Sequence, residues 1–78
     1  GIILYPNPAN QTVNISVTQA SGNANVSIFD INGRLILTKE ISLDTTTSLD
    51  VSQVTSGVYL VQVTAQEGFI KTTKLIIQ

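Results

Sequence analysis

Alternating apolar and polar residues dominate the chain and predict short β-strands with one buried face and one solvent-facing face. The pattern is clearest in residues 12–18, TVNISVT, where every second side chain from Val13 on is apolar. Residues 24–31 have apolar side chains on both faces, which predicts a more central strand. Further strands are predicted at 34–41, 47–51, 58–65 and 69–78. No stretch has the periodicity of a helix of useful length.

Glycine-containing and polar segments separate these strands at intervals of roughly 8–12 residues, which is typical of a small β-sandwich. The sequence therefore predicts an all-β fold: a small antiparallel immunoglobulin-like β-sandwich of about six to seven strands. Residues 52–55 are predicted to form one helical or 3₁₀ turn capped by Ser52. Residues 66–68, Gln-Glu-Gly, are predicted to form a hairpin turn.

Residues 30–34, DINGR, allow two different turns. Asn32-Gly33 suits a two-residue type I′ hairpin. Alternatively, Asp30 caps a type I turn and Gly33 takes the left-handed position, which gives a three-residue loop with a bulge. The Asp30 carboxylate favours the second alternative, because it suits the first position of the turn.

The chain begins with an apolar run that leads into LYPNPAN, residues 4–10. Each proline fixes its own φ, lacks a backbone N–H and keeps the residue before it out of the helical region. This segment is therefore expected to be extended and to form a stiff strand at a sheet edge. We expect residues 1–10 to be a linker and first strand, and residues 11–78 to be the body of a single domain.

The composition excludes several classes of function. The net charge of −1 argues against nucleic acid, which requires a basic patch, and gives no support for binding to an anionic membrane surface. No apolar run approaches the length of about 20 residues that spans a bilayer, and no signal peptide is recognisable. Because the chain starts at Gly1 rather than Met, it is expected to be a fragment of a longer precursor or a processed product.

The residues that usually carry chemistry are scarce. Histidine and cysteine are absent, which removes the usual general base, the usual metal ligands and every Ser-His triad. No two carboxylates are close in sequence, so a catalytic pair would form only if the fold brought two of them together. Asp30 is better explained as a turn cap, and Asp50 as a surface residue of a strand. We expect no enzyme activity, no cofactor and no metal. The carboxylates are Asp30, Glu40, Asp44, Asp50 and Glu67.

The few aromatic residues make a weak case for a sugar-binding platform. Phe29 and Tyr59 sit in apolar strands and are expected in the core, which leaves Tyr5 and Phe69 as isolated rings. Chance explains the N-x-S/T sequons best in a chain rich in Asn, Ser and Thr; they begin at Asn10, Asn14 and Asn25. The residues taken alone predict a non-catalytic β-module whose function is to be recognised or to connect other parts.

Four sequence blocks carry a resemblance to a known family. They are LYPNPAN followed by TVNIS, then VSIFDINGRLI, then LDVSQVTSGVYLVQV, and finally KTTKLIIQ. In this order, which covers nearly all of residues 4–78, they resemble the type A C-terminal sorting domain of the bacterial type IX secretion system. Two small departures are Thr55, where the family often has Pro or Ala, and Gln78, where it often ends in a basic residue.

The resemblance implies a passive secretion signal that follows a cargo protein of the Bacteroidetes type. The precursor would pass through the periplasm on its way to the outer membrane and cell surface. Its sorting domain would be recognised by the outer-membrane translocon and a shuttle protein. A sortase-like cysteine protease would then cleave upstream of Tyr5. We expect no nucleic acid partner, given the net charge of −1, and no direct membrane insertion.

The candidate recognition residues lie in the last strand, where Thr72–Ile77 could offer an edge to a partner sheet. Lysines there could instead protect the edge from aggregation, and both alternatives stay open. The candidate recognition residues are Lys71, Lys74, Leu75, Ile76 and Ile77. The other motif residues are expected to be mainly structural, with a tyrosine-corner-like hydrogen bond at Tyr59; they are Tyr5, Pro6, Asn7, Pro8, Asp30, Gly33, Gly57 and Tyr59.

Two other functions compete with sorting. The first is a carbohydrate-binding or adhesive β-sandwich of an extracellular enzyme, which a row of exposed aromatic residues or a calcium-binding carboxylate cluster would favour. The second is a purely structural linker domain.

Overall fold

The computed structural model describes residues 1–66 and 68–78, and these residues form seven β-strands. In chain order the strands are β1 (Ile2–Tyr5), β2 (Thr12–Val17), β3 (Asn23–Asp30), β4 (Leu35–Ser42), β5 (Thr47–Asp50), β6 (Gly57–Ala65) and β7 (Ile70–Ile77). All pairings between these strands are antiparallel. The prediction of an all-β fold of six to seven short strands is therefore confirmed.

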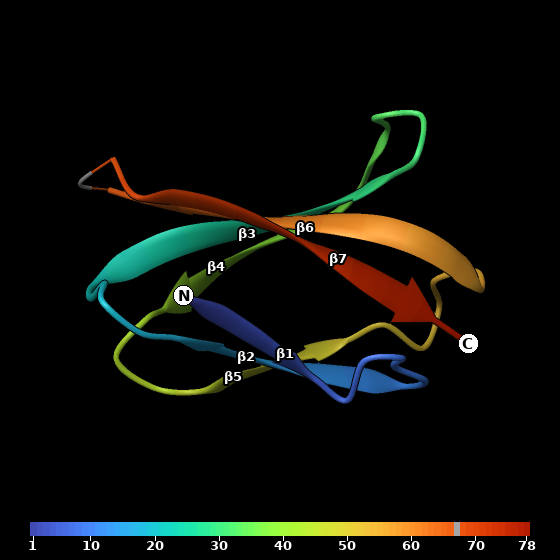
Figure 1. Cartoon of the computed structure of the whole chain (residues 1–78), viewed down its shortest axis with the longest axis horizontal. Coiled ribbons are helices and arrows are strands. Elements are labelled where there is room, and N and C mark those ends of the chain that lie inside the picture. Colours follow the sequence, from blue (N-terminus) through green and yellow to red (C-terminus); the bar gives the residue numbers. More distant parts are fainter. Residues whose placement is uncertain (67) are drawn as a thin grey trace.

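The strands divide into two sheets, which lie above one another in Figure 1. The smaller sheet has the order β1-β2-β5, and the larger has the order β4-β3-β6-β7. β3 lies between β4 and β6, as its two apolar faces predicted. Because β4 pairs with β3, the order differs from that of immunoglobulin constant domains, whose fourth strand joins the sheet of the first, second and fifth.

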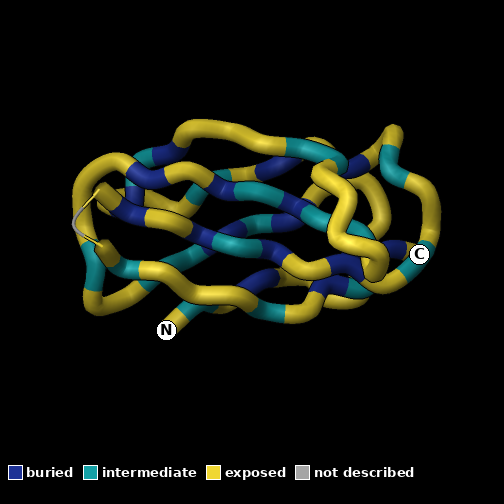
Figure 2. The backbone as a smooth tube through the Cα atoms, turned by 90° about the horizontal axis from the view of Figure 1, so that it is seen from above, coloured by how far each residue is buried: buried dark blue, intermediate teal, exposed yellow. Residues whose placement is uncertain are grey.

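Alternation along the strands builds one core between the sheets, and Figure 2 shows buried positions alternating with exposed or half-buried ones along several strands. Val13 and Ile15 of β2 are 0% and 1% exposed, as the TVNIS pattern predicted. The larger sheet contributes most of the other fully buried side chains, including Ile28 and Leu75. Full burial of each such side chain contributes about 1.5–3 kcal/mol, so this apolar layer is the main stabiliser of the domain.

The two ends of the sandwich carry different parts of the chain (Figure 1). The proximal end holds Gly1 and the connections β2–β3, β4–β5 and β6–β7. The distal end holds the connections β1–β2, β3–β4 and β5–β6 together with the C-terminal Gln78. Any segment that precedes Gly1 therefore leaves from the end opposite to the C-terminus.

The β3–β4 hairpin adopts the second of the two predicted turns. The Gly33 N–H donates to the Asp30 carbonyl at 3.0 Å, and the Asp30 N–H donates to the Arg34 carbonyl at 3.0 Å. Gly33 has φ +84°, a left-handed conformation that glycine adopts without steric cost. The loop is thus three residues long with glycine in its last position. In the predicted 66–68 turn, Gly68 likewise donates to the Ala65 carbonyl at 3.2 Å, and Glu67 lies outside the described residues.

A turn is present at residues 52–54, as predicted, but two local predictions were wrong: the residue that caps this turn and the burial of Phe29. Residues 52–54 form a turn closed by the bond from the Val54 N–H to the Val51 carbonyl, and its cap is Asp50 rather than Ser52. The Asp50 carboxylate accepts the Ser52 N–H at 2.9 Å, a local bond that Asp favours two residues ahead of itself. Phe29, expected in the core, is half-buried on the outward face of the larger sheet, because β3 has apolar residues on both faces.

Candidate recognition site at the distal end

The segment after β1 turns onto β7 and does not continue as an extended strand. β1 is an edge strand, as predicted, but it ends at Tyr5, and residues 6–8 bend. The peptide bonds Tyr5–Pro6 and Asn7–Pro8 are both cis. Residues 6–9, named the clasp below, lie beside the end of β7, and Ala9 forms a bridge with Ile77. The prediction of an extended Pro-Asn-Pro stretch was wrong, because contacts with the far end of the chain fix its path.

The clasp bonds to β7 in the pattern of a parallel strand pair. The Ala9 N–H donates to the Ile76 carbonyl, and the Ala9 carbonyl accepts the Gln78 N–H, both at 2.8 Å. Asn7 repeats this pattern one step earlier with its side chain: Nδ2 donates to the Lys74 carbonyl and Oδ1 accepts the Ile76 N–H, both at 3.0 Å. A carboxamide offers the same donor and acceptor as a peptide group. The Asn7 side chain therefore takes the place of a strand residue on this edge.

The clasp covers only the second half of the outer edge of β7. Its bonds go to residues 74, 76 and 78, and alternate residues of an antiparallel strand direct their backbone groups to opposite sides. The backbone groups of Ile70 and Thr72 therefore face the same side, beyond the reach of the clasp. β7 is an edge strand, as predicted, with its first half open and its second half covered.

The five candidate recognition residues of the last strand fall into two groups. The side chains of Leu75 and Ile77 are 0% and 2% exposed and belong to the core. They hold the tail in the fold and cannot contact a partner while the domain is folded. Lys71 and Lys74 are exposed, and Ile76 is half-buried. Because the two lysines are three positions apart in a strand, their side chains point to opposite faces of the sheet.

The β3–β4 hairpin at the same end is organised by the Asp30 carboxylate. Its Oδ1 accepts the N–H groups of Asn32 and Arg34, both at 2.9 Å, and its Oδ2 lies 3.2 Å from Nε of Arg34. These contacts, above all the bond from the Arg34 N–H, lower the pKa of Asp30 below its ordinary value. The carboxylate that was predicted to cap this turn is therefore its structural centre.

Tyr59 fixes the β5–β6 connection. Its ring is buried, and its hydroxyl donates a hydrogen bond to the carbonyl of Thr55, four residues earlier. This is the tyrosine-corner-like bond that the sequence predicted. Gly57 lies against the ring, and a Cβ at that position would sit 3.6 Å from it. Nearby, hydrogen bonds from the hydroxyl and the N–H of Ser52 lower the pKa of Asp50.

The clasp, the β3–β4 hairpin, the Tyr59 corner and the buried tail come from four separate blocks of sequence, and the fold gathers all of them at the distal end (Figure 1). A family model described as secretion system C-terminal sorting domain matches residues 3–78. The chain belongs to this family. The resemblance to type IX sorting domains that the ordered motifs indicated is therefore confirmed, and such a domain implies export of its cargo to the outer membrane or cell surface.

One curated relative of the sorting domain is an endo-acting ulvan lyase from Formosa agariphila. The two sequences are 32% identical over 75 residues, which is 96% of this chain. The chain spans 14% of the length of that relative. The similarity therefore concerns a small part of a much larger protein and says nothing about the lyase reaction in this chain.

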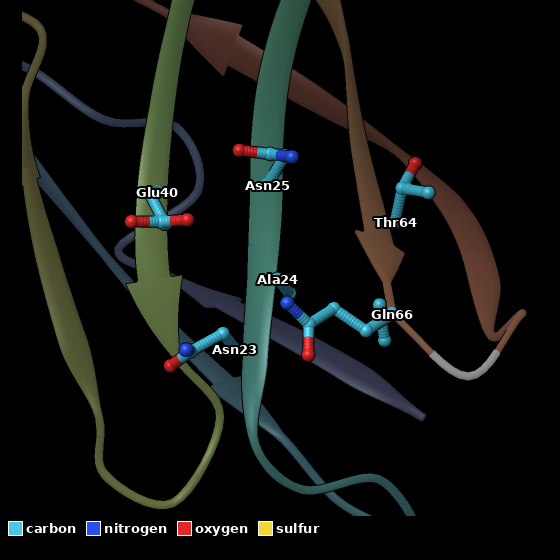
Figure 3. Close-up of a pocket in the computed structure, with 7 residues that line it drawn as sticks. Asn23, Ala24, Asn25, Glu40, Thr64 and Gln66 are labelled. Atoms are coloured by element: carbon cyan, nitrogen blue, oxygen red, sulfur yellow. The ribbon is translucent and has the colours of Figure 1, made fainter.

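A shallow hollow lies at the proximal end of the sorting domain (Figure 3). It is lined by Asn23, Ala24, Asn25, Glu40, Thr64, Ala65 and Gln66. Figure 3 shows polar side chains from three neighbouring strands around it and no aromatic ring. Nothing in this lining resembles the aromatic platform of a sugar-binding module.

Other chemistry finds little support in the described part of the sorting domain. Residues 1–66 and 68–78 contain no group of three or more side chains that could hold a metal ion. The same residues include no helix that is long and apolar enough to cross a membrane. Tyr5 is 44% exposed on the smaller sheet and Phe69 is half-buried at the proximal end, so these two rings form no common surface.

Proposed function

We propose that this sorting domain directs a cargo protein, which precedes it in the chain, through the outer membrane by way of the type IX translocon and a shuttle protein. The observation that carries the proposal is the family match over residues 3–78. The precursor passes through the periplasm, where the sandwich folds. The domain acts as a passive, non-catalytic signal and does not itself insert into the membrane.

The tail of the signal is presented by the fold as an ordered strand. Leu75 and Ile77 anchor β7 in the core, and the clasp bonds its outer edge. This leaves Lys71, Lys74 and part of Ile76 accessible from the last strand. We infer that the sorting machinery reads exposed groups of this strand, and not the whole apolar tail.

Removal of the signal by a sortase-like protease fits a site upstream of Ile2. A protease binds its substrate in an extended form, and residues 2–5 are already paired with β2. Leu4 is 9% exposed, and Gly1 is hydrogen-bonded to Thr18. Cleavage before β1 leaves the sandwich intact, whereas cleavage within β1 requires this strand to detach first.

A secretion assay tests the proposed function. Residues 1–78 are fused behind a signal peptide and a fluorescent reporter, and the reporter is measured in the medium of a host with a type IX system. The matched controls are the reporter without the domain and the same fusion in a strain without the translocon. Export of the full fusion alone supports sorting. Retention of a folded fusion in the periplasm of the intact host contradicts it.

A further inference from the structure

The outward face of the larger sheet is divided into an apolar half and a polar half. At its distal end, one row of neighbours crosses all strands of the sheet: Leu35, Phe29, Leu60 and Lys74. The next pair toward the C-terminus is Val58 and Ile76. Leu35, Val58 and Leu60 are 50%, 46% and 44% exposed. The apolar residues of this group, Phe29, Leu35, Val58, Leu60 and Ile76, are named the distal patch.

The proximal half of the same face is mostly polar, as expected for a surface in contact with solvent. Its first row consists of Thr38, Ser27, Gln62 and Thr72. Its second row consists of Glu40, Asn25, Thr64 and Ile70. These eight positions include a single apolar residue, whereas the six distal positions include five apolar residues and Lys74. A contiguous exposed apolar area next to a normal polar one marks an interaction surface.

The charge beside the distal patch restricts what can cover it. Lys74 pairs directly with Leu60 and carries the positive charge at that side of the patch. Within residues 1–66 and 68–78 the one ion pair joins Arg34 to Asp30, so this part of the chain gives Lys74 no counter-charge. A partner therefore matches the surface when it is apolar at its centre and presents a carboxylate opposite Lys74.

Two other occupants fit this chemistry less well. A second copy of the domain, docked through the same patch, would offer Lys74 no carboxylate, since the patch contains none. An anionic lipid surface attracts clusters of basic residues. Beside the patch lies a single lysine, Lys74, and the net charge of the chain is −1. A protein surface with an acidic group remains the best match.

We propose that the distal patch, with Lys74 at its side, is the docking surface for the outer-membrane protein that recognises this sorting domain. The proposal rests on the proposed sorting function and names the face that carries it. This face lies at the end of the sandwich opposite to Gly1 (Figure 1). A bulky cargo attached before Gly1 therefore leaves the face accessible. The face also distinguishes the two lysines, because Lys74 shares the face of the patch and Lys71 points to the other side.

The secretion assay described above tests this surface with two double variants. Val58→Thr with Leu60→Thr removes apolar groups from the distal patch while keeping good strand formers. Ile3→Thr with Ile70→Thr is the matched control, since these side chains are also exposed, at 56% and 60%. We expect export to fall roughly tenfold or more for the patch variant, because each 1.4 kcal/mol of lost binding is tenfold. The control variant should be exported like the intact fusion.

A charge reversal provides a second test that removes no apolar contact. Lys74→Glu should lower export several-fold, whereas Lys71→Glu, on the opposite face, should not. Thermal melting of each purified variant domain shows whether it is folded. If the patch variant melts below the growth temperature of the host, the comparison of Lys74→Glu with Lys71→Glu tests the docking surface in its place.

The possible failures are distinct. If the intact fusion is not exported, the proposed function fails and this inference fails with it. If the intact fusion and both threonine variants are exported equally, or both variants lose export equally, sorting stands and the docking surface is refuted. A purified intact domain that sediments as a dimer, and becomes a monomer in the patch variant, would also overturn the proposal by making the patch a self-association surface.

Discussion

The bonds of the Asn7 side chain to β7 offer a direct test of the clasp. Asn7→Ala removes the donor to the Lys74 carbonyl and the acceptor for the Ile76 N–H while leaving the prolines on either side in place. The bonds of Ala9 to β7 remain available. The substitution therefore isolates the carboxamide that stands in for a strand residue.

The magnitude follows from the two bonds that are lost. An intramolecular hydrogen bond contributes about 0.5–1.5 kcal/mol net, and both of these are solvent-exposed, so we expect a loss of about 1–2 kcal/mol. In a domain of this size, each kcal/mol lowers the Tm by roughly 4–8 °C, which predicts a decrease of about 4–16 °C. Asn14→Ala, which removes a single exposed bond to the Tyr5 carbonyl, is the matched control and should cost about half as much.

Amide hydrogen exchange locates the effect. The Ile76 N–H is bonded by the Asn7 side chain, so it should be protected in the intact domain and exchange faster in Asn7→Ala. The Leu75 N–H faces β6 and should keep its protection in the variant, apart from any global loss of stability. The quantity to compare is the ratio of the Ile76 exchange rate to the Leu75 exchange rate in the two proteins. If this ratio is the same in the intact domain and in Asn7→Ala, the clasp bond is not formed in solution.

Three further predictions concern the turns. Tyr59→Phe loses the hydroxyl bond of a buried ring and should destabilise the domain by about 1–2 kcal/mol in urea unfolding, with the slope m unchanged. Gly33→Ala places a side chain at φ +84° and should cost about 1–2 kcal/mol, whereas Gly57→Ala, which meets only ordinary contacts, should cost less in the same assay. The pKa values of Asp30 and Asp50 lie below 3.8 in the native state, so their stabilisation is complete above that pH and is lost as the pH falls through the lower native values. Acid titrations of Tm should show this loss, and replacing both carboxylates with Asn should weaken it.

Local chemistry explains which parts of the structure could be predicted from the sequence. Strand β2 follows from strict alternation, because one solvent-facing side and one buried side leave a single register for the strand. The hairpin at Asp30 follows from the turn chemistry of Asp and Gly at fixed spacing. The corner bond of Tyr59 also spans only four residues. In each case the interacting groups are close in sequence, so the residues themselves contain the information.

The clasp could not be predicted in this way, because it joins residues at opposite ends of the sequence. Asn7 and Lys74 are 67 positions apart, and nothing in the composition of either segment specifies the other. Without a partner, the backbone preferences of Pro6 and Pro8 predict an extended strand. The distal patch has the same origin: the residues of a cross-strand row are placed side by side only once the order β4-β3-β6-β7 is known. Contacts and surfaces of this kind can be predicted only after the order of the strands is known.

The coupling between the clasp and the tail also changes how a signal at the C-terminus must be tested. Deleting residues 74–78 removes Lys74, but it also removes Leu75 and Ile77 from the core and both bonding partners of Asn7. Losing one large buried side chain costs about 2–5 kcal/mol, and a whole domain has only about 5–15 kcal/mol of stability. A truncated domain that fails to be exported has therefore lost its fold together with its signal. Substitutions at exposed positions of the same strand separate the two, because they leave the core and the clasp in place and change only what a partner can touch.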